Sequence, residues 1–234
     1  MGHVHFNTQN PEAHRRFWTL LGAKPVKPLL ANEVYQVPNA LILVRKQDVS
    51  GGTVGSVVHH IGFRVVDLDS MIEKCKQAGI RVLTPPETTA RTHKSYVMGP
   101  DDVTVEFLAD PEMKVPIAFH HVHFFTSSVE EMRAWYIQRF RAVPGKRDQF
   151  EVADIPGADL SFSPSKTPLS PTVGRALDHI GFEVHNLEAF CKDLVAAGIK
   201  LDRPYTKLPA GLAIAFLTDP WGTNIELTEG LTQW

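Results

Sequence analysis

HVHF stands at residues 3–6 and again at residues 121–124, and HIGF stands at residues 60–63 and again at residues 179–182. The matched positions are about 118 to 119 residues apart, which is close to half of the 234-residue chain. A self-similar period of this kind indicates an internal duplication and must be interpreted before any single motif.

The duplication works on two levels, because each half contains two related segments. The stretch from Asp67 to Ile80 in the first half, for example, is matched by Asn186 to Ile199 in the second. We therefore predict four modules, numbered 1 to 4 along the chain, at residues 1–55, 56–115, 116–172 and 173–234. Consecutive modules would form an N-terminal domain of residues 1–115 and a C-terminal domain of residues 116–234, each of a usual domain size.

Each module predicts the same order of elements, a strand, a helix and then three strands. The alternation in residues 121–125 is typical of a strand, and it sends every second side chain to one face. Asp67 and Asn186 are plausible N-caps of the helices that follow, where apolar residues recur at helical spacing. Proline and glycine separate the later strands. The pattern indicates an α+β protein built from curved mixed sheets with helices outside.

Two sets of residues have side chains able to bind a metal. They are His3, His60 and Glu106 in the first half, and His121, His179 and Glu226 in the second. Two imidazoles and one carboxylate form a facial triad that holds a divalent metal with positions left open for substrate. Both glutamates lie in apolar strand sequences, where an unpaired carboxylate is costly. The alternative is a glutamate on the solvent face of an edge strand and histidines satisfied by ordinary hydrogen bonds. The donors suit iron, manganese, zinc or nickel.

His5 and His123 lie two residues beyond the first histidine of each half and are expected to face the same way. We interpret them as polar groups of the cavity, with His123 as the candidate general acid–base group. The alternative is packing chemistry inherited through the duplication. The two cysteines, Cys75 and Cys191, occupy equivalent positions on apolar helix faces and are expected to pack there as small hydrophobes.

From His3 to about Glu229 the sequence resembles the vicinal oxygen chelate superfamily, whose members include glyoxalase I, extradiol dioxygenases, fosfomycin-resistance enzymes and bleomycin-binding proteins. Residues 178–184 and 219–227 look like the opening strand and the closing turn and strand of a member's module. The resemblance implies four βαβββ modules paired into two open mixed-sheet barrels. It also implies a metal inside the barrel, bound by the first-strand histidine of each module and the last-strand glutamate of the second.

The resemblance implies a metal-dependent enzyme that binds a small substrate through vicinal oxygens, with lyase or isomerase chemistry favoured. His121, His179 and Glu226 are the first choice of site because their surroundings keep the family pattern best; His3, His60 and Glu106 are the second. Glyoxalase-type members take a fourth ligand from a position that is Asp159 in the second half and Leu41 in the first. A fourth ligand would favour Lewis-acid chemistry, whereas the alternative for Asp159 is a turn residue.

Two other functions stay open. An extradiol-type ring-cleaving dioxygenase would carry a histidine and a tyrosine ahead of the final glutamate, but Phe216 stands ten residues before Glu226. His93 and Tyr96 precede Glu106, but their spacing departs from that signature. The other alternative is a non-catalytic protein that binds a small molecule or antibiotic without a metal.

Net charge and the length of apolar runs exclude some classes of binding partner. The formal net charge is −2 at pH 7 and no basic stripe is interleaved with aromatic residues, which argues against nucleic acid. No apolar run approaches the ~20 residues of a membrane span. We expect a small-molecule substrate, a possible homodimer and a cytoplasmic location, with an N-terminal leader lost before residue 1 as the alternative.

Overall fold

The computed structural model describes residues 1–89, 92–147 and 149–231, and its α+β architecture confirms the predicted order of elements in all four modules. Module 1 contains β1 (His3–Thr8), α1 (Pro11–Leu21), β2 (Lys24–Leu29), β3 (Asn32–Val37) and β4 (Ala40–Lys46). Module 2 contains β5 (Val58–Val65), α2 (Leu68–Gln77), β6 (Arg81–Thr88), β7 (His93–Met98), a short 3-10 helix (Pro100–Asp102) and β8 (Thr104–Ala109). Module 3 contains β9 (Ile117–Thr126), α3 (Val129–Phe140), β10 (Val143–Arg147), β11 (Phe150–Ile155) and β12 (Ala158–Pro164). Module 4 contains β13 (Leu177–Glu183), α4 (Leu187–Ala196), β14 (Arg203–Lys207), a second 3-10 helix (Pro209–Gly211), β15 (Ala213–Thr218) and β16 (Asn224–Glu229).

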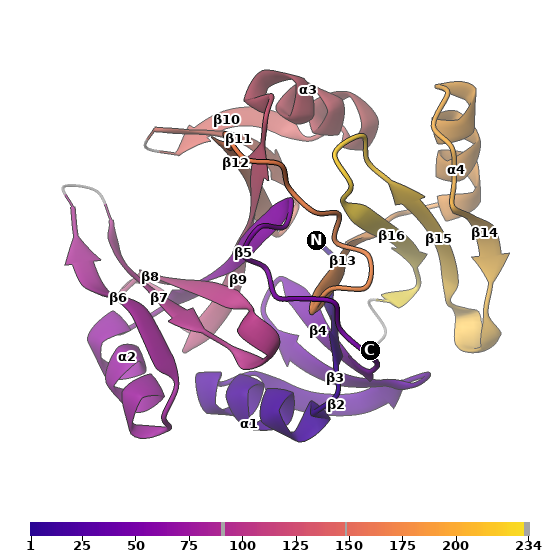
Figure 1. The fold of residues 1–234 in the computed structure, drawn as a ribbon. Helices are drawn as coiled ribbons and strands as arrows, with labels where there is room; N and C mark the ends of the chain where they lie inside the picture. The colour runs from indigo at the N-terminus through magenta and orange to yellow at the C-terminus, as the bar shows by residue number, and fades with distance from the viewer. Residues whose placement is uncertain (90–91, 148, 232–234) are drawn as a thin grey trace.

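The strands form two mixed eight-stranded sheets, and each sheet is an open barrel with its helices outside (Figure 1). One sheet has the order β14-β15-β16-β13-β1-β4-β3-β2, and the other has β10-β11-β12-β9-β5-β8-β7-β6. Module 1 therefore pairs with module 4, and module 2 pairs with module 3. We refer to these as the 1/4 barrel and the 2/3 barrel.

This pairing corrects the expectation that consecutive modules share a barrel. The first strands of paired modules run antiparallel, β1 against β13 and β5 against β9, and both pairs join one half of the sequence to the other. The division into residues 1–115 and 116–234 describes the repeat in the sequence, but each sheet takes strands from both halves. The sequence did not predict this pairing because the first strands of all four modules derive from the same repeated pattern. Local sequence therefore does not distinguish one partner strand from another.

The helix ends follow the predicted capping. The Asp67 side chain accepts a hydrogen bond from the Ser70 backbone N–H, and the Asn186 side chain accepts one from the Ala189 N–H. One continuous apolar core contains residues from all four modules. Both cysteines are buried and unpaired, in line with a packing role. Over the part of the chain that the structure describes, no helix is long and apolar enough to cross a membrane.

Candidate metal centres

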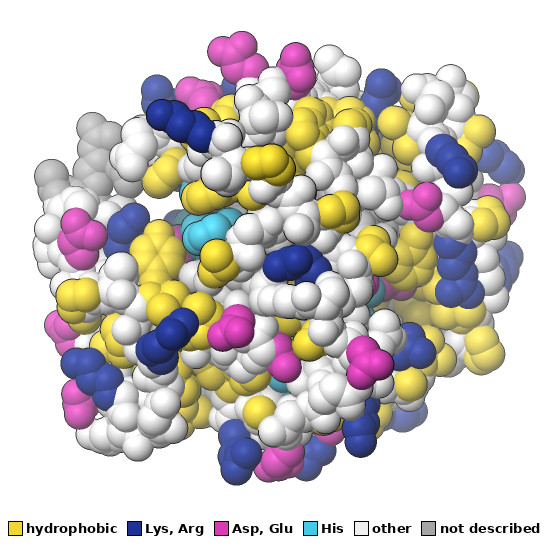
Figure 2. Space-filling view, viewed as in Figure 1, with side chains coloured by type: hydrophobic (Ala, Val, Ile, Leu, Met, Phe, Trp, Pro, Cys, Tyr) yellow, Lys and Arg dark blue, Asp and Glu magenta, His cyan; other side chains and the backbone are white. Residues whose placement is uncertain are grey.

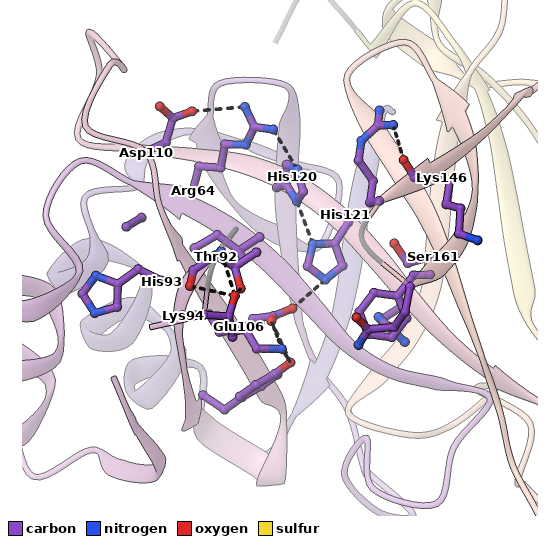
Figure 3. A pocket seen from close by; sticks show the side chains of 18 residues that line it. Arg64, Thr92, His93, Lys94, Glu106, Asp110, His120, His121, Lys146 and Ser161 are labelled. Carbon is purple, nitrogen blue, oxygen red and sulfur yellow. Dashed lines mark hydrogen bonds and ion pairs between the residues drawn. The ribbon is translucent and has the colours of Figure 1, made fainter. Parts of the chain in front are cut away.

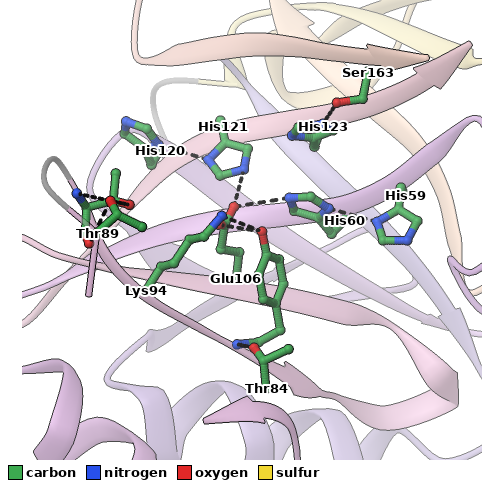
Figure 4. Close-up of polar contacts among 12 residues, drawn as sticks. His59, His60, Thr84, Thr89, Lys94, Glu106, His120, His121, His123 and Ser163 are labelled. Atoms are coloured by element: carbon green, nitrogen blue, oxygen red, sulfur yellow. Dashed lines mark hydrogen bonds and ion pairs between the residues drawn. The ribbon is translucent and has the colours of Figure 1, made fainter. Parts of the chain in front are cut away.

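The 2/3 barrel brings two histidines onto one carboxylate oxygen. His60 Nε2 on β5 and His121 Nε2 on β9 lie 3.1 and 3.0 Å from Glu106 Oε2 on β8 (Figure 4). All three residues are buried, each with 5% or less of its surface exposed. We call this group the 2/3 centre.

The 1/4 barrel repeats the arrangement with the equivalent residues. His3 Nε2 on β1 and His179 Nε2 on β13 both lie 3.0 Å from Glu226 Oε2 on β16. His3 Nε2 is close to this oxygen but makes no aligned hydrogen bond, and its Nδ1 has no partner either. A buried imidazole with both nitrogens unsatisfied is unusual, and a cation bound at Nε2 would satisfy one of them. We call this group the 1/4 centre.

The six predicted residues therefore form two groups, but not the two that were expected. His3 joins the second-half pair His179 and Glu226, while His121 joins the first-half pair His60 and Glu106. His3 and His121 each lie beside residues of the other half of the sequence, because β1 pairs with β13 and β9 pairs with β5. The first-choice and second-choice combinations were wrong in this respect, and ligation of a metal by the new groups stays a proposal.

The glycine of each HIGF motif makes room for the histidine of the partner module. A Cβ added to Gly62 would lie 2.0 Å from His121 Cε1, and one added to Gly181 would lie 2.0 Å from His3 Cε1. Such distances are far inside contact range, so any other residue would displace the imidazole. The repeated glycine was visible in the sequence, but its meaning depends on a neighbour from another module.

A second histidine lies beside each group. His5 stacks on His179 with ring centroids 4.2 Å apart, and His123 stacks on His60 at 4.5 Å. In each centre the ring nitrogens of three histidines lie within 4.8 Å of one another, as a shared metal would require. The partners of these second histidines differ, because His123 Nε2 lies 2.8 Å from Ser163 Oγ whereas His5 Nδ1 is buried without a partner.

The two centres open onto cavities of different size and character. The 2/3 centre forms part of a cavity of about 870 Å³, whereas the 1/4 centre borders one of about 260 Å³. Figure 3 shows Glu106 and His121 at the wall of the larger cavity, near Lys94 and Ser161. On the face drawn in Figure 2, the largest visible group of histidine atoms lies between the segments labelled β5 and β12 in Figure 1. The larger cavity has room for a small-molecule substrate.

A family model described as Glyoxalase/Bleomycin resistance protein/Dioxygenase superfamily matches residues 1–107 and 118–227. The chain belongs to this superfamily. The structure of glyoxalase I from Zea mays superposes with a TM-score of 0.80 and 16% identity, covering 97% of this chain and 91% of that one. A Bacillus subtilis protein with a provisional dioxygenase assignment gives a TM-score of 0.70 and 12% identity, covering 97% and 84%. At these identities the likeness shows the fold alone. No curated protein matched the sequence significantly.

Electrostatics differ between the two centres of this superfamily member. Burial lowers the pKa of His60 to about 4, which leaves its imidazole neutral near pH 7, as metal ligation requires. Burial also opposes charge on His179, but hydrogen bonds with Asp178 and Glu226 outweigh it and raise the pKa to about 9. Burial favours a neutral Glu106, yet its contacts with His121 and His60 keep its pKa well below the usual range.

Asp159 faces His121 across the β9–β12 pair but is turned to other partners. Its Oδ2 lies 3.2 Å from Arg147 Nε and 3.6 Å from His120 Nε2. Its carboxylate is not one of the groups whose ligand atoms cluster at the 2/3 centre. The 2/3 centre therefore offers His60, His121 and Glu106, with His123 beside them. Asp159, for which the sequence left a fourth ligand or a turn residue open, is the second residue of β12 and is engaged by Arg147 and His120.

A chain of contacts, visible in Figure 3, connects His121 to solvent-facing charges. A guanidinium only donates, so Arg64 Nη2 donates to His120 Nε2 at 3.1 Å and places the His120 ring hydrogen on Nδ1. That hydrogen points to His121 Nδ1 at 2.8 Å, which leaves the hydrogen of a neutral His121 on Nε2. A metal at Nε2 would reverse this chain, with His120 Nε2–H directed to Asp159. Binding of a metal at His121 Nε2 would thus be coupled to the tautomer of His120.

Two residues of the large cavity contact Glu106 but were assigned no site role from the sequence. The Tyr96 hydroxyl donates to Glu106 Oε1 at 2.7 Å, and Lys94 Nζ lies 3.7 Å from the same oxygen. Tyr96 stands ten residues before Glu106, the spacing at which Phe216 precedes Glu226. The signal was present in the first half and was misjudged there. Both side chains hold the carboxylate oxygen that the two histidines do not contact.

Proposed function

We propose that this chain is a metal-dependent enzyme of the glyoxalase and dioxygenase type, and that its reaction takes place at the 2/3 centre. The observation that carries the proposal is the convergence of His60 and His121 on one oxygen of buried Glu106, at the wall of a cavity of about 870 Å³. Two imidazoles and a carboxylate suit iron(II), manganese, zinc or nickel. When bound, such a metal supplies Lewis-acid stabilisation of negative charge on a substrate oxygen.

The charges of the cavity support an anionic substrate. Among the described lining residues the cations are Arg64, Lys94, Lys146 and Arg147, and the acids are Glu106 and Asp110. Arg64 is paired with Asp110, Lys146 with Glu151, and Arg147 with Asp154 and Asp159, whereas the acid paired with Lys94 is Glu106, itself a ligand in this proposal. The Lys94 ammonium, near Glu106 and about one-fifth exposed, would repel a bare metal ion and favours the arrival of negative charge. We infer a small substrate with vicinal oxygens and a carboxylate or similar anionic group.

Three side chains would handle protons and orientation. His123 borders the cavity, and its second nitrogen is held by Ser163, so the ring is positioned to accept or donate a proton at the substrate. Tyr96 fixes the orientation of Glu106 through the 2.7 Å hydrogen bond. Lys94 would contact the substrate anion. This set favours proton transfer next to a carbonyl, as in lyase and isomerase chemistry.

The test combines metal loading with a proton-transfer assay. Protein loaded in turn with nickel, zinc, manganese or iron(II) is incubated in D₂O with a panel of small 2-oxo and 2-hydroxy acids, and deuterium incorporation is followed by NMR. Exchange that requires metal, and that His60→Ala abolishes, supports the proposal. We expect His123→Ala to reduce the exchange rate by about 10²- to 10⁴-fold while the metal content is retained. Tight ligand binding by metal-free protein without exchange would instead support the non-catalytic binder.

Ring-cleaving oxygenation is the second candidate, and one observation favours it. Asp159 is held by Arg147 and His120, so the 2/3 centre has the three-residue triad that leaves positions open, and Tyr96 stands beside it. Oxygen consumption by iron(II)-loaded protein in the presence of catechols distinguishes this candidate. Lyase or isomerase activity would tolerate nickel or zinc, whereas oxygen consumption would require iron(II) or manganese.

A further inference from the structure

We propose that the 1/4 centre is a closed structural metal site with four protein ligands, in which His5 joins His3, His179 and Glu226. This inference goes beyond the proposed function, since it concerns the centre where no reaction is placed. It depends on differences between two sites that share the same ligand triad.

The first observation is the unsatisfied state of His5. Its side chain is buried with 6% of its surface exposed, and Nδ1 has no hydrogen-bond partner. The ring lies on β1 two residues from His3, and its ligand nitrogen is within 4.8 Å of those of His3 and His179. Coordination to a shared ion would remove the cost of this unpaired buried nitrogen.

The matched residue of the other barrel is already engaged. His123 gives or takes a hydrogen bond at Ser163 Oγ, 2.8 Å from its Nε2, and this contact occupies one of its two ring nitrogens. Strand registers place Arg45 in module 1 where module 3 has Ser163. Arg45 is exposed and can only donate, so it offers His5 no equivalent of the serine oxygen. Nδ1 of His5 therefore has no competing hydrogen bond, whereas one nitrogen of His123 is already engaged.

The residue before the second ligand also differs. Asp178 Oδ1 lies 2.6 Å from His179 Nδ1, whereas the equivalent partner of His60 is the imidazole of His59, with its Nδ1 at 2.9 Å. A carboxylate on the far nitrogen orients a metal-bound histidine and makes it a stronger ligand. Asp178 is itself fixed by Asn7 and by the Gly174 backbone N–H, at 3.1 and 2.7 Å. The carboxylate behind His179 thus gives the 1/4 centre an orienting contact that the 2/3 centre lacks.

Polar side chains that serve the large cavity are replaced by apolar ones around the 1/4 centre. Phe216 pairs with Glu226 at the register position where Tyr96 pairs with Glu106. Leu43 pairs with His5 at the position where Ser161 pairs with His123. The hydroxyl that holds Glu106 therefore has no counterpart beside Glu226.

Apolar residues from both modules form a cluster that lines much of the smaller cavity. Its buried members are Leu29, Val34, Leu41, Leu43, Leu212, Ile214 and Leu231. The remaining cavity of about 260 Å³ is less than a third of the other. A structural metal site has all its positions filled by protein, whereas a catalytic one keeps a position open. With His5 as a ligand, the 1/4 centre matches the structural description in ligand number, and the smaller cavity leaves less room for a substrate.

The proposed ligands come from two modules that are far apart in the sequence. His3 and His5 lie on β1, near the beginning of the chain, and His179 and Glu226 lie on β13 and β16 of the last module. A metal bound by all four would connect module 1 to module 4 across their shared sheet. An ion that binds the folded state alone raises stability by mass action, so it would stabilise the junction of the two chain halves.

The experiment isolates each centre and then removes its second histidine. His60→Ala leaves the 1/4 centre, and His179→Ala leaves the 2/3 centre. Metal-free protein is titrated with Co²⁺, and absorption and thermal unfolding are recorded. In the His60→Ala background we expect His5→Phe, which keeps the stacked ring, to weaken Co²⁺ binding by about 10-fold or more and to lower the metal-dependent gain in Tm. The matched control, His123→Phe in the His179→Ala background, should change Co²⁺ affinity much less.

Access is tested with 4-nitrocatechol, a bidentate probe whose absorption shifts when it chelates a metal. Co²⁺-loaded His179→Ala protein should bind one equivalent at the open 2/3 centre, and loaded His60→Ala protein should bind none. Probe binding by loaded His60→Ala protein, unchanged Co²⁺ affinity after His5→Phe, or no Co²⁺ uptake by His60→Ala protein would each overturn the inference. None of these results depends on turnover, so failure of the proposed enzyme activity remains distinguishable.

Discussion

Gly62 and Gly181 each lie against the imidazole of a proposed ligand that comes from another module. Because an added Cβ would lie 2.0 Å from His121 or His3, we expect Gly62→Ala to displace His121 and to weaken metal binding at the 2/3 centre by roughly 10- to 100-fold. Gly181→Ala should do the same at the 1/4 centre through His3. Overpacking should also reduce stability by about 1–3 kcal/mol in each variant.

Each glycine variant serves as the control for the other. Metal content per chain, measured on both proteins together with Tm, should show loss at one centre and retention at the other. Equal loss of both metals from either variant would indicate general unfolding. Retention of both metals would show that the imidazole can move without cost, against the close approach seen here.

Asp159 provides a second test at the scale of single residues. If metal binding reverses the hydrogen bonds between His120 and His121, then the His120 Nε2–H needs Asp159 as its acceptor. We expect Asp159→Leu, which installs the residue found at the equivalent position 41, to weaken metal binding at the 2/3 centre about 10-fold. Competition with a chromophoric chelator measures this affinity. An unchanged value would show that Arg64 keeps its place on His120 in the loaded protein.

At the scale of elements, the helix ends differ in a way that stability measurements can detect. Asn186 caps α4 through the Ala189 N–H, and its backbone has φ +53, a left-handed conformation that asparagine tolerates better than most residues. Asn186→Ala should therefore lower the free energy of unfolding by about 1–2 kcal/mol. Ser128, at the start of α3, makes no side-chain capping hydrogen bond, so Ser128→Ala is the matched control with a smaller expected effect. Urea denaturation of both variants compares them, and equal losses would contradict the capping argument.

The elements themselves were largely predictable because their signals are local. Alternation over a few residues specifies a strand, and Asp67 or Asn186 ahead of a helical period specifies where a helix begins. The role of Tyr96 was also within reach, since its spacing from Glu106 is fixed by the hairpin of β7 and β8. Its hydrogen bond to Glu106 follows from directly opposed strand positions, a relation that the sequence encodes once the hairpin is assigned.

The choice of partner module lies beyond local signals. β1 pairs with β13 and β5 pairs with β9, yet β1, β5, β9 and β13 all derive from the same repeated pattern. Ligand types were therefore predictable while ligand combinations were not. The decision rests on contacts far apart in sequence, including the fit of His121 over Gly62 and of His3 over Gly181. These contacts join residues of different modules, so the periodicity of the sequence alone does not specify them.

The pairing can be tested across the whole molecule by counting metals in double variants. If the protein binds two metals, then His60→Ala and His121→Ala should each remove one, and the double variant should remove no more than one, because both residues belong to the 2/3 centre. His3→Ala combined with His60→Ala should remove both, because those residues belong to different centres. Pairing of consecutive modules predicts the opposite result for each combination. Metal content measured by elemental analysis on the four proteins, with Tm to confirm folding, therefore decides between two architectures that share every module.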